Sequence, residues 1–420
     1  MIKYLFISLS FLLSVPLTAG LIPADDPNIQ YIGRIDFTNK KAPLISWAGP
    51  CVRANFTGTS LKIKIDGKGS QHMFGVIING NYDDVKVFKC NAGEGVYDIA
   101  SGLENKTHEV LIHKRTDGGK NEIAFIGFEL DDGASLKAPP SRPRLRMEVY
   151  GDSISTGLGG DRKRGKEHSL EATDNVFSYG ARTARNINAE FHCISKSGIG
   201  LTKSWWPTIM PQYYDRLSAC SLEGKGKKWD FSKWQPHLVC INLFQNDSWT
   251  DKKPDKDKVI AKYMSFVEGI RGHYPKAKIV CLLGAMDASK GRWGGFMKEA
   301  VKKLNDAGDK EVYSYLFKIQ TGHRHPNNGE QAKMAAELTE FLKNLDLKPD
   351  PPKEVKKAEV KKYPPATAEE IKMHAFLIRA YRKFKAGQMS KEKFKEGAAK
   401  IAASLPGTKT ADIAKKLIDQ

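Results

Sequence analysis

The chain has 420 residues, with 67 Lys and Arg against 48 Asp and Glu, which gives a formal net charge of +19 at pH 7. Its hydrophobic content of 40% is enough to bury a substantial core, and roughly 150 residues per domain predicts two or three domains. This composition excludes a wholly disordered, a collagen-like and a multi-span membrane chain. Net positive charge attracts any polyanion, so charge alone does not separate nucleic acid, anionic membrane and acidic polysaccharide as partners.

Residues 1–19 have the pattern of a signal peptide. One Lys precedes an apolar run of about a dozen residues, and Leu17-Thr18-Ala19 fits cleavage after Ala19. The apolar run is shorter than the roughly 20 residues that a transmembrane helix needs, and no later segment qualifies. We therefore expect a secreted or periplasmic protein without a transmembrane span.

The cysteines indicate neither a metal site nor a cofactor, because they form no CxxC pair and no Cys/His cluster at zinc spacing. Export permits disulfides, and Cys51 with Cys90 is the pair to test first, with a bridge and two free thiols both left open. Cys193, Cys240 and Cys281 lie in apolar, strand-like runs, which predicts buried free thiols.

Residues 28–138 predict an antiparallel β-sandwich of the jelly-roll type. Short runs rich in β-branched and aromatic residues are separated by turn signals such as Asp66-Gly67 and Asn79-Gly80, and no helical pattern intervenes. The strand candidates include residues 60–65, 73–78, 85–88, 108–113 and 122–129. The segment PPSRP at residues 139–143 then marks a domain boundary, because prolines stiffen the chain and remove amide donors.

Residues 144–345 alternate apolar strands with helical patterns, which predicts an α/β domain with a parallel sheet covered on both faces. The strand candidates are residues 145–150, 190–194, 236–243, 277–283 and 313–318, and the helix candidates are residues 177–188, 258–274, 294–306 and 329–345. Functional residues are expected in the loops at the carboxyl ends of the strands.

The C-terminal part is predicted to be a Pro- and Lys-rich linker, residues 346–366, followed by a basic helical tail, residues 367–420. Thr367, Ser390 and Thr408 are candidate helix N-caps. Residues 347–420 contain 18 Lys and Arg and 9 Asp and Glu, so they carry a net +9. Either these helices are simply solvated or they attach the protein to an anionic surface such as acidic polysaccharide. Nucleic acid is not expected for an exported chain without a recognition motif.

The first predicted strand of the α/β domain leads into YGDSISTG at residues 150–157. A serine hydroxyl becomes a nucleophile only when a base takes its proton and nearby donors hold the oxyanion. A strand-to-helix turn would expose Ser153 and leave backbone N–H groups free for that purpose. Taken alone, this segment also fits a turn serine that merely caps a helix.

Three further segments follow in a specific order: SKSGIG at residues 195–200, NLFQND at residues 242–247 and HRHPNN at residues 323–328. Serine, glycine, asparagine and histidine blocks in this order resemble the SGNH (GDSL-like) hydrolases. The segments NVFSYGAR (175–182), NAEFHCIS (188–195) and MPQYYDR (210–216), with GRID (33–36) and ISWAGP (45–50) in the first domain, resemble carbohydrate esterase family 2.

This resemblance covers roughly residues 28–345. It implies an N-terminal jelly roll joined to a three-layer α/β/α domain, which removes acetyl groups from plant polysaccharides such as xylan or glucomannan. Residue by residue, it implies Ser153 as nucleophile and His325 as base. It also implies an oxyanion hole formed by the backbone N–H groups of Ser153 and Gly198 with the side-chain amide of Asn246.

The sequence departs from the SGNH pattern in two places. Phe244 stands where the third block normally has glycine, which puts the local loop geometry in doubt. No acidic residue precedes His325 at short range, where Gly322 and His323 stand. We therefore expect a Ser-His dyad whose imidazole is oriented by a backbone carbonyl of residues 322–323, with Asp287 as a more distant alternative third member.

Aromatic residues flank these blocks and suit sugar recognition, because pyranose C–H faces pack on flat rings. Trp205, Trp206 and Trp249 are the candidates, with Trp249 as a substrate wall and one of Trp205 and Trp206 packed beneath its loop. The sequence thus predicts a secreted serine esterase that acts on an acetylated polysaccharide or oligosaccharide. Two alternatives stay open: an SGNH esterase for other acyl esters or acetylated sialic acid, and a non-catalytic carbohydrate-binding protein.

Overall fold

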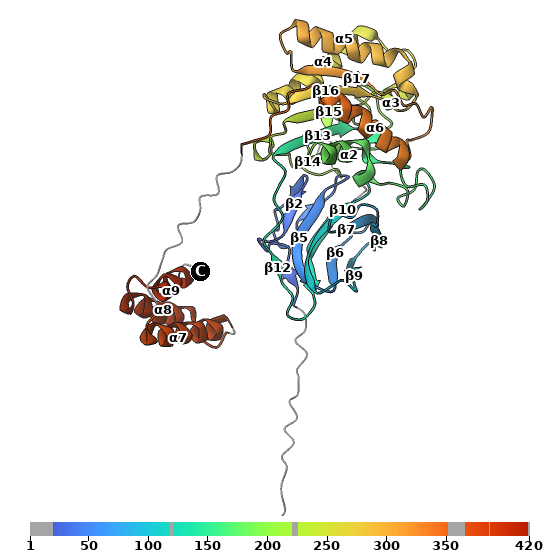
Figure 1. The fold of residues 1–420 in the computed structure, drawn as a ribbon. Coiled ribbons are helices and arrows are strands. Elements are labelled where there is room, and N and C mark those ends of the chain that lie inside the picture. The colour runs from blue at the N-terminus through green and yellow to red at the C-terminus, as the bar shows by residue number, and fades with distance from the viewer. Residues whose placement is uncertain (1–19, 118–120, 221–225, 352–365, 386, 419–420) are drawn as a thin grey trace, which may run out of the picture. The chain divides into compact units, whose positions relative to one another are not determined.

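The computed structural model describes residues 20–117, 121–220, 226–351, 366–385 and 387–418. The chain divides into two compact units, Met1–Pro351 and Pro352–Gln420 (Figure 1). The expected signal peptide and most of the expected linker lie outside the described residues. Within these ranges, every helix is too short or too polar to span a bilayer.

Two antiparallel sheets of six strands each form the N-terminal part of the first unit, which confirms the predicted β-sandwich. One sheet has the order β3-β4-β11-β6-β9 with β1 paired to β11, and the other has the order β12-β5-β10-β7-β8 with β2 paired to β5. The strands are β1 (Ile22–Pro23), β2 (Gln30–Ile32), β3 (Ile35–Asp36), β4 (Leu44–Ile45), β5 (Cys51–Gly58), β6 (Leu61–Asp66), β7 (His72–Ile78), β8 (Lys86–Cys90), β9 (Glu94–Ala100), β10 (Lys106–Lys114), β11 (Ile123–Leu130) and β12 (Leu136–Lys137).

The sandwich forms because its strands alternate between a buried and an outward face. In β6, Leu61, Ile63 and Ile65 are buried while Lys62 is exposed, as the two-residue period of a strand requires. Side chains from both sheets, including Ile63 of one and Val110 of the other, belong to one apolar cluster.

Of the two alternatives left open for Cys51 and Cys90, the structure shows two free thiols and no bridge between them. They lie on β5 and β8 of the same sheet, with β10 and β7 between them. Because β5 and β8 are three strand spacings apart, about 14 Å separates them. The Cα atoms of a disulfide lie within roughly 7 Å of each other. Cys193, Cys240 and Cys281 are buried free thiols, as predicted.

The second part of the first unit is a parallel sheet of order β14-β13-β15-β16-β17. Its strands are β13 (Leu145–Gly151), β14 (Ala189–Ser195), β15 (Leu238–Asn242), β16 (Lys278–Leu283) and β17 (Val312–Leu316), and its main helices are α2 (Tyr179–Asn186), α4 (Lys256–His273), α5 (Arg292–Asp306) and α6 (Asn328–Leu342). The ends of these elements differ from the predicted ones by at most three residues. The short helices α1 (Ser153–Thr156) and α3 (Gln245–Thr250) were not predicted as elements.

Helices cover both faces of this sheet, as predicted (Figure 1). Val239 and Ile241 of β15 belong to the apolar cluster formed with α4 and α5, while Leu238 and Cys240 belong to the cluster formed with α2 and α6. The chain order of the strands reverses at β13, which has β14 on one side and β15 on the other. Loops at the carboxyl ends of strands beside such a reversal are the usual ligand-binding region of open α/β sheets.

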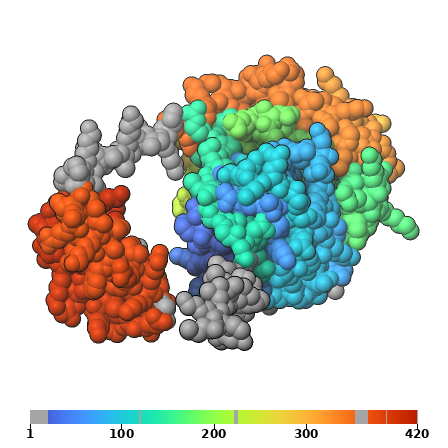
Figure 2. Space-filling view, turned by 60° about the horizontal axis from the view of Figure 1, so that its bottom comes forward, coloured from blue at the N-terminus to red at the C-terminus, as the bar shows by residue number. Residues whose placement is uncertain are grey.

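The second unit contains α7 (Ala368–Lys385), α8 (Lys391–Ser404) and α9 (Lys409–Ile418). Its apolar cluster includes Leu377, Phe394 and Ala414, one from each helix, and Figure 2 shows the three helices as one packed body. The expected caps are present: Thr367 Oγ1 accepts from Glu370 N, Ser390 Oγ from Lys393 N and Thr408 Oγ1 from Ala411 N.

Candidate active site

Ser153 lies at the turn where β13 ends and α1 begins. Asp152 caps this short helix by accepting a hydrogen bond from Ile154 N, and Gly157 ends it in the left-handed conformation. Gly151 is required because a Cβ atom there would lie 2.1 Å from Ser155 Oγ. The turn presents Ser153 at the carboxyl end of β13, where the strand order of the sheet reverses.

His325 reaches Ser153 from the loop that precedes α6. Its Nε2 atom lies 2.8 Å from Ser153 Oγ, and the histidine is buried. Two contacts hold this loop: Thr321 Oγ1 donates to Arg324 O at 2.7 Å, and Asn327 with Glu330 forms a reciprocal cap at the start of α6. The expected nucleophile and base are therefore within hydrogen-bonding distance of each other.

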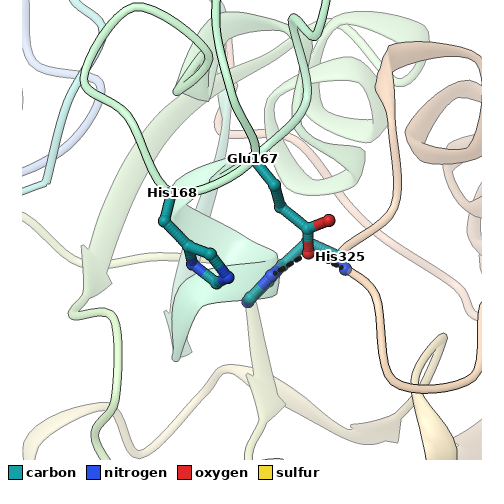
Figure 3. A group of neighbouring side chains, drawn as sticks. All are labelled: Glu167, His168 and His325. Carbon is teal, nitrogen blue, oxygen red and sulfur yellow. Dashed lines mark hydrogen bonds and ion pairs between the residues drawn. The ribbon is translucent and has the colours of Figure 1, made fainter.

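The prediction that a backbone carbonyl of residues 322–323 orients the His325 imidazole is wrong. The Glu167 carboxylate contacts the imidazole instead (Figure 3). Glu167 Oε1 accepts from His325 Nδ1 at 2.8 Å and from His325 N at 2.7 Å. Arg162 then donates to Glu167 Oε2 at 2.9 Å and to His325 O at 2.6 Å. Ser153, His325 and Glu167 thus have the geometry of a serine-hydrolase triad.

Glu167 was missed because it lies 158 residues before His325 in the chain. Its loop, between α1 and α2, contains several charged residues, and that composition is equally typical of a solvated loop. No local spacing rule connects this loop to the histidine block.

Asp287, the alternative third member, belongs to a different cluster. Its carboxylate accepts from Gln245 Nε2 at 2.8 Å and from Trp249 Nε1 at 3.1 Å, and it lies 3.3 Å from His323 Nδ1. These contacts orient the Trp249 ring, and none of them involves His325.

Asn246 lies between the serine turn and the glycine block. Its Nδ2 atom donates to Ile199 O at 2.8 Å and has a longer contact of 3.4 Å with Asp152 Oδ2. Gly198 has a φ of +83°, and a Cβ atom there would lie 3.0 Å from Trp206 Nε1. Asn246 Nδ2 therefore contacts Asp152, which precedes Ser153, and Ile199, which follows Gly198. The three residues expected to form the oxyanion hole thus lie close together.

Asp247, next to Asn246, fastens the loop that follows Gly198. Its carboxylate accepts hydrogen bonds from the backbone N–H groups of Leu201, Thr202 and Lys203 and from the Thr202 hydroxyl. The buried carboxylate of the asparagine block thus holds the loop that follows the glycine block. The sequence predicted a role for Asn246 alone.

Phe244 adopts the backbone conformation that glycine would favour at this position. Its φ is +89°, in the left-handed region that costs a residue with a Cβ roughly 1–2 kcal/mol. The ring is fully buried, with centroid distances of 5.0 Å to both Tyr263 and Trp293. The loop keeps its geometry because packing of the ring offsets the backbone strain.

Burial lowers the pKa of His325 below its usual value, although the neighbouring Glu167 carboxylate opposes this shift. The imidazole is therefore largely neutral at pH 7 and can accept the Ser153 proton. Burial also raises the pKa of Asp152 to about 7. The partly uncharged Asp152 reduces the repulsion that a nearby oxyanion would otherwise meet.

Trp205 and Trp206 lie on the loop after the glycine block, and Trp249 lies in α3, which begins within the asparagine block. Trp205 and Trp206 are 62% and 40% exposed, so the expectation that one of them packs beneath its loop is wrong. Trp206 Nε1 donates to Ser197 O at 2.7 Å, and Lys196 Nζ lies 4.6 Å from the centre of its ring. The two exposed rings offer flat surfaces beside the glycine block, and the contacts of Trp206 fix the position of its ring.

The structure also groups ligand-type atoms that the sequence separates. One oxygen or nitrogen atom from each of Glu167, His168 and His325 lies within 4.8 Å of the others (Figure 3). His168 is exposed, and its ring meets the His325 ring edge to face at a centroid distance of 5.3 Å.

Comparisons with known proteins show which family the chain is similar to. Residues 31–140 match the family model described as carbohydrate esterase 2 N-terminal. The chain is 34% identical over 334 residues to a cellulase/esterase of Acetivibrio thermocellus, which covers 76% of this chain but only 40% of that protein. It is 24% identical to an acetylxylan esterase / glucomannan deacetylase of Cellvibrio japonicus, with 77% and 90% of the two chains covered.

A solved structure shows a similar fold. The family two carbohydrate esterase from Clostridium thermocellum in complex with cellohexaose is 32% identical, with a TM-score of 0.69. The similarity covers 75% of this chain and 98% of that one.

Proposed function

Because the chain belongs to carbohydrate esterase family 2, we propose that it removes O-acetyl groups from carbohydrate through an acetyl-enzyme on Ser153. The observation that carries the proposal is the 2.8 Å hydrogen bond between Ser153 Oγ and His325 Nε2, with Glu167 on the other imidazole nitrogen. This arrangement gives a serine the base that it needs.

The reaction would proceed in two halves. His325 takes the Ser153 proton as the hydroxyl attacks the acetyl carbonyl, and the resulting oxyanion is held by Ser153 N, Gly198 N and the Asn246 amide. The imidazolium then protonates the sugar oxygen, which leaves. Water enters, gives a proton to His325 and attacks the acetyl carbonyl. The bond between the acetyl carbon and Ser153 Oγ then breaks, His325 returns the proton to Oγ, and acetate leaves.

Ser153→Ala tests the nucleophile. We expect it to abolish acetate release from acetylated xylan, acetylated glucomannan and p-nitrophenyl acetate. Ser155→Ala is the matched control, because Ser155 Oγ faces the Tyr179 hydroxyl at 2.9 Å instead. The control should lose about 1 kcal/mol of stability and retain turnover, and full activity of Ser153→Ala would refute the mechanism.

Asn246→Ala tests the oxyanion hole. Loss of one preorganised donor typically lowers kcat about 100- to 1,000-fold, and we expect a loss of this size with p-nitrophenyl acetate. An unchanged kcat would remove Asn246 from the mechanism.

For the substrate we propose an acetylated plant polysaccharide or one of its oligosaccharides, in a secreted or periplasmic setting. Support comes from the names of the relatives and from Trp205, Trp206 and Trp249 around the site. Acetylated xylan and glucomannan should be turned over faster than acetylated sialic acid or longer acyl esters in a competition assay. Faster turnover of either alternative would redirect the assignment.

For the C-terminal helices we propose attachment to an anionic polysaccharide, supported by the net +9 of residues 347–420. The full chain should bind an immobilised acidic polysaccharide more tightly than a neutral one, and salt should weaken that binding. Equal retention on both matrices would contradict this role.

A further inference from the structure

His168 has no part in the reaction proposed above, yet it lies beside the base. Its ring is exposed, and the centroid is 5.3 Å from that of His325 at an interplanar angle of 88°. Glu167 precedes it in the chain and holds His325 Nδ1. Two histidines and one carboxylate therefore converge at the edge of the triad (Figure 3).

We propose that Glu167, His168 and His325 form an inhibitory binding site for a divalent transition-metal cation of the zinc type. Two imidazoles and a carboxylate are a ligand set that Zn²⁺ favours, whereas Mg²⁺ and Ca²⁺ favour sites built from oxygen atoms. The ligand atoms lie within 4.8 Å of one another, and tetrahedral coordination at about 2.0–2.1 Å places ligand atoms roughly 3.4 Å apart. For a cation on Nδ1, Glu167 Oε1 and His325 Nδ1 would therefore move slightly apart from their present 2.8 Å. The exposed His168 side chain can move to bring its ring nitrogen to the same cation.

Coordination stops catalysis whichever nitrogen of His325 the cation uses. A cation on Nδ1 leaves the proton of the neutral ring on Nε2, so Nε2 cannot accept the Ser153 proton. A cation on Nε2 occupies the lone pair itself. In both cases the base is lost, and a chelator restores it because no covalent bond is made or broken.

Arg162 sets a limit on the affinity. Its guanidinium donates to Glu167 Oε2 at 2.9 Å, which leaves Oε1 for the cation and places a positive charge nearby. The site should therefore bind zinc more weakly than a dedicated structural zinc site and release it readily.

The experiment measures both inhibition and binding on the full, untagged chain. Buffered Zn²⁺ is titrated into the p-nitrophenyl acetate assay, and zinc binding is measured separately by calorimetry. We expect reversible inhibition by Zn²⁺ and none by Mg²⁺ at the same concentration. His168→Gln should keep the uninhibited rate and weaken both inhibition and calorimetric binding at least tenfold, a loss typical of damaged metal sites.

His323→Gln is the matched control, because His323 is an exposed histidine next to a carboxylate, Asp287, at 3.3 Å. It should leave the zinc inhibition constant unchanged. Equal inhibition of His168→Gln and the wild type, or equal inhibition by Mg²⁺, would overturn the proposal. The inhibition assay rests on the proposed function, but calorimetric binding does not, so a chain without esterase activity would still test the metal site.

Discussion

Arg115 Nη1 lies 2.7 Å from Asp174 Oδ2, and this ion pair joins the β-sandwich to the loop that carries Glu167. Arg115 directly follows β10, and both partners are only 1% exposed. Its guanidinium also donates to Asp161 Oδ2 at 3.0 Å and to Thr173 O at 3.2 Å. One side chain of the sandwich thus fastens the loop on both sides of Glu167.

Replacement of Arg115 should therefore impair catalysis as well as stability. Arg115→Gln leaves Asp174 charged and buried, which costs about 3–5 kcal/mol, and it frees the loop that positions the triad acid. We expect a lower Tm and a kcat reduced at least tenfold at a temperature where the protein is folded. Arg115→Lys should restore part of both.

Arg34→Gln is the matched control for Arg115→Gln. Arg34 is a second buried arginine of the sandwich, and it pairs with Glu148 of β13 at 3.0 Å, with both side chains fully buried. It should lower Tm by a similar amount without a comparable loss of kcat. Equal losses of kcat in both variants would show that the Arg115 effect is one of general stability.

Glu167→Gln should lower kcat for acetate release by at least about 100-fold, since a substituted triad acid can cost up to 10⁴-fold. The amide keeps the size of the side chain but removes the charge that stabilises the imidazolium formed during the reaction. Glu171→Gln, on the same loop but paired with Lys89 at 3.3 Å, is the control and should retain wild-type activity. Wild-type kcat in Glu167→Gln would return the site to a Ser-His dyad.

The pH profile should follow the ionisation of His325. Burial lowers the pKa of His325, and Glu167 partly offsets this shift, so activity should be lost only as pH falls below about 6.5, the ordinary value for histidine. Loss of the carboxylate in Glu167→Gln should lower the pKa further and move the acid limb of kcat/KM to lower pH. The measurement is made with chelator present, and a limb that moves to higher pH would contradict the assignment.

Phe244 allows a direct comparison of backbone strain with packing. Phe244→Ala loses the buried ring, at a cost of about 3–5 kcal/mol, and keeps the left-handed strain. Phe244→Gly loses the same ring but relieves the strain, so it should be more stable than Phe244→Ala by about 1 kcal/mol. Thermal unfolding followed by tryptophan fluorescence tests this, because all seven tryptophans precede residue 352 and report on the first unit. A less stable glycine variant would show that φ at this position carries no strain.

Features that depend on near neighbours in the chain were predictable from the residues alone. Alternating burial in segments such as residues 61–65, the helical periods of the α/β part and the caps at Thr367 and Ser390 are local properties, so their elements were predictable. The serine and histidine blocks were recognisable because each is a short segment and the blocks follow one another in a known order. The structure brings Ser153 and His325 together.

The distant residues that complete the site became apparent from the three-dimensional fold. Glu167 meets His325 across 158 positions, and Arg115 reaches the Glu167 loop from the β-sandwich. The Cys51 and Cys90 thiols lie apart because two strands are inserted between theirs in the sheet. Such pairings depend on how the strands and loops are ordered in space, and chain spacing carries no signal for that order.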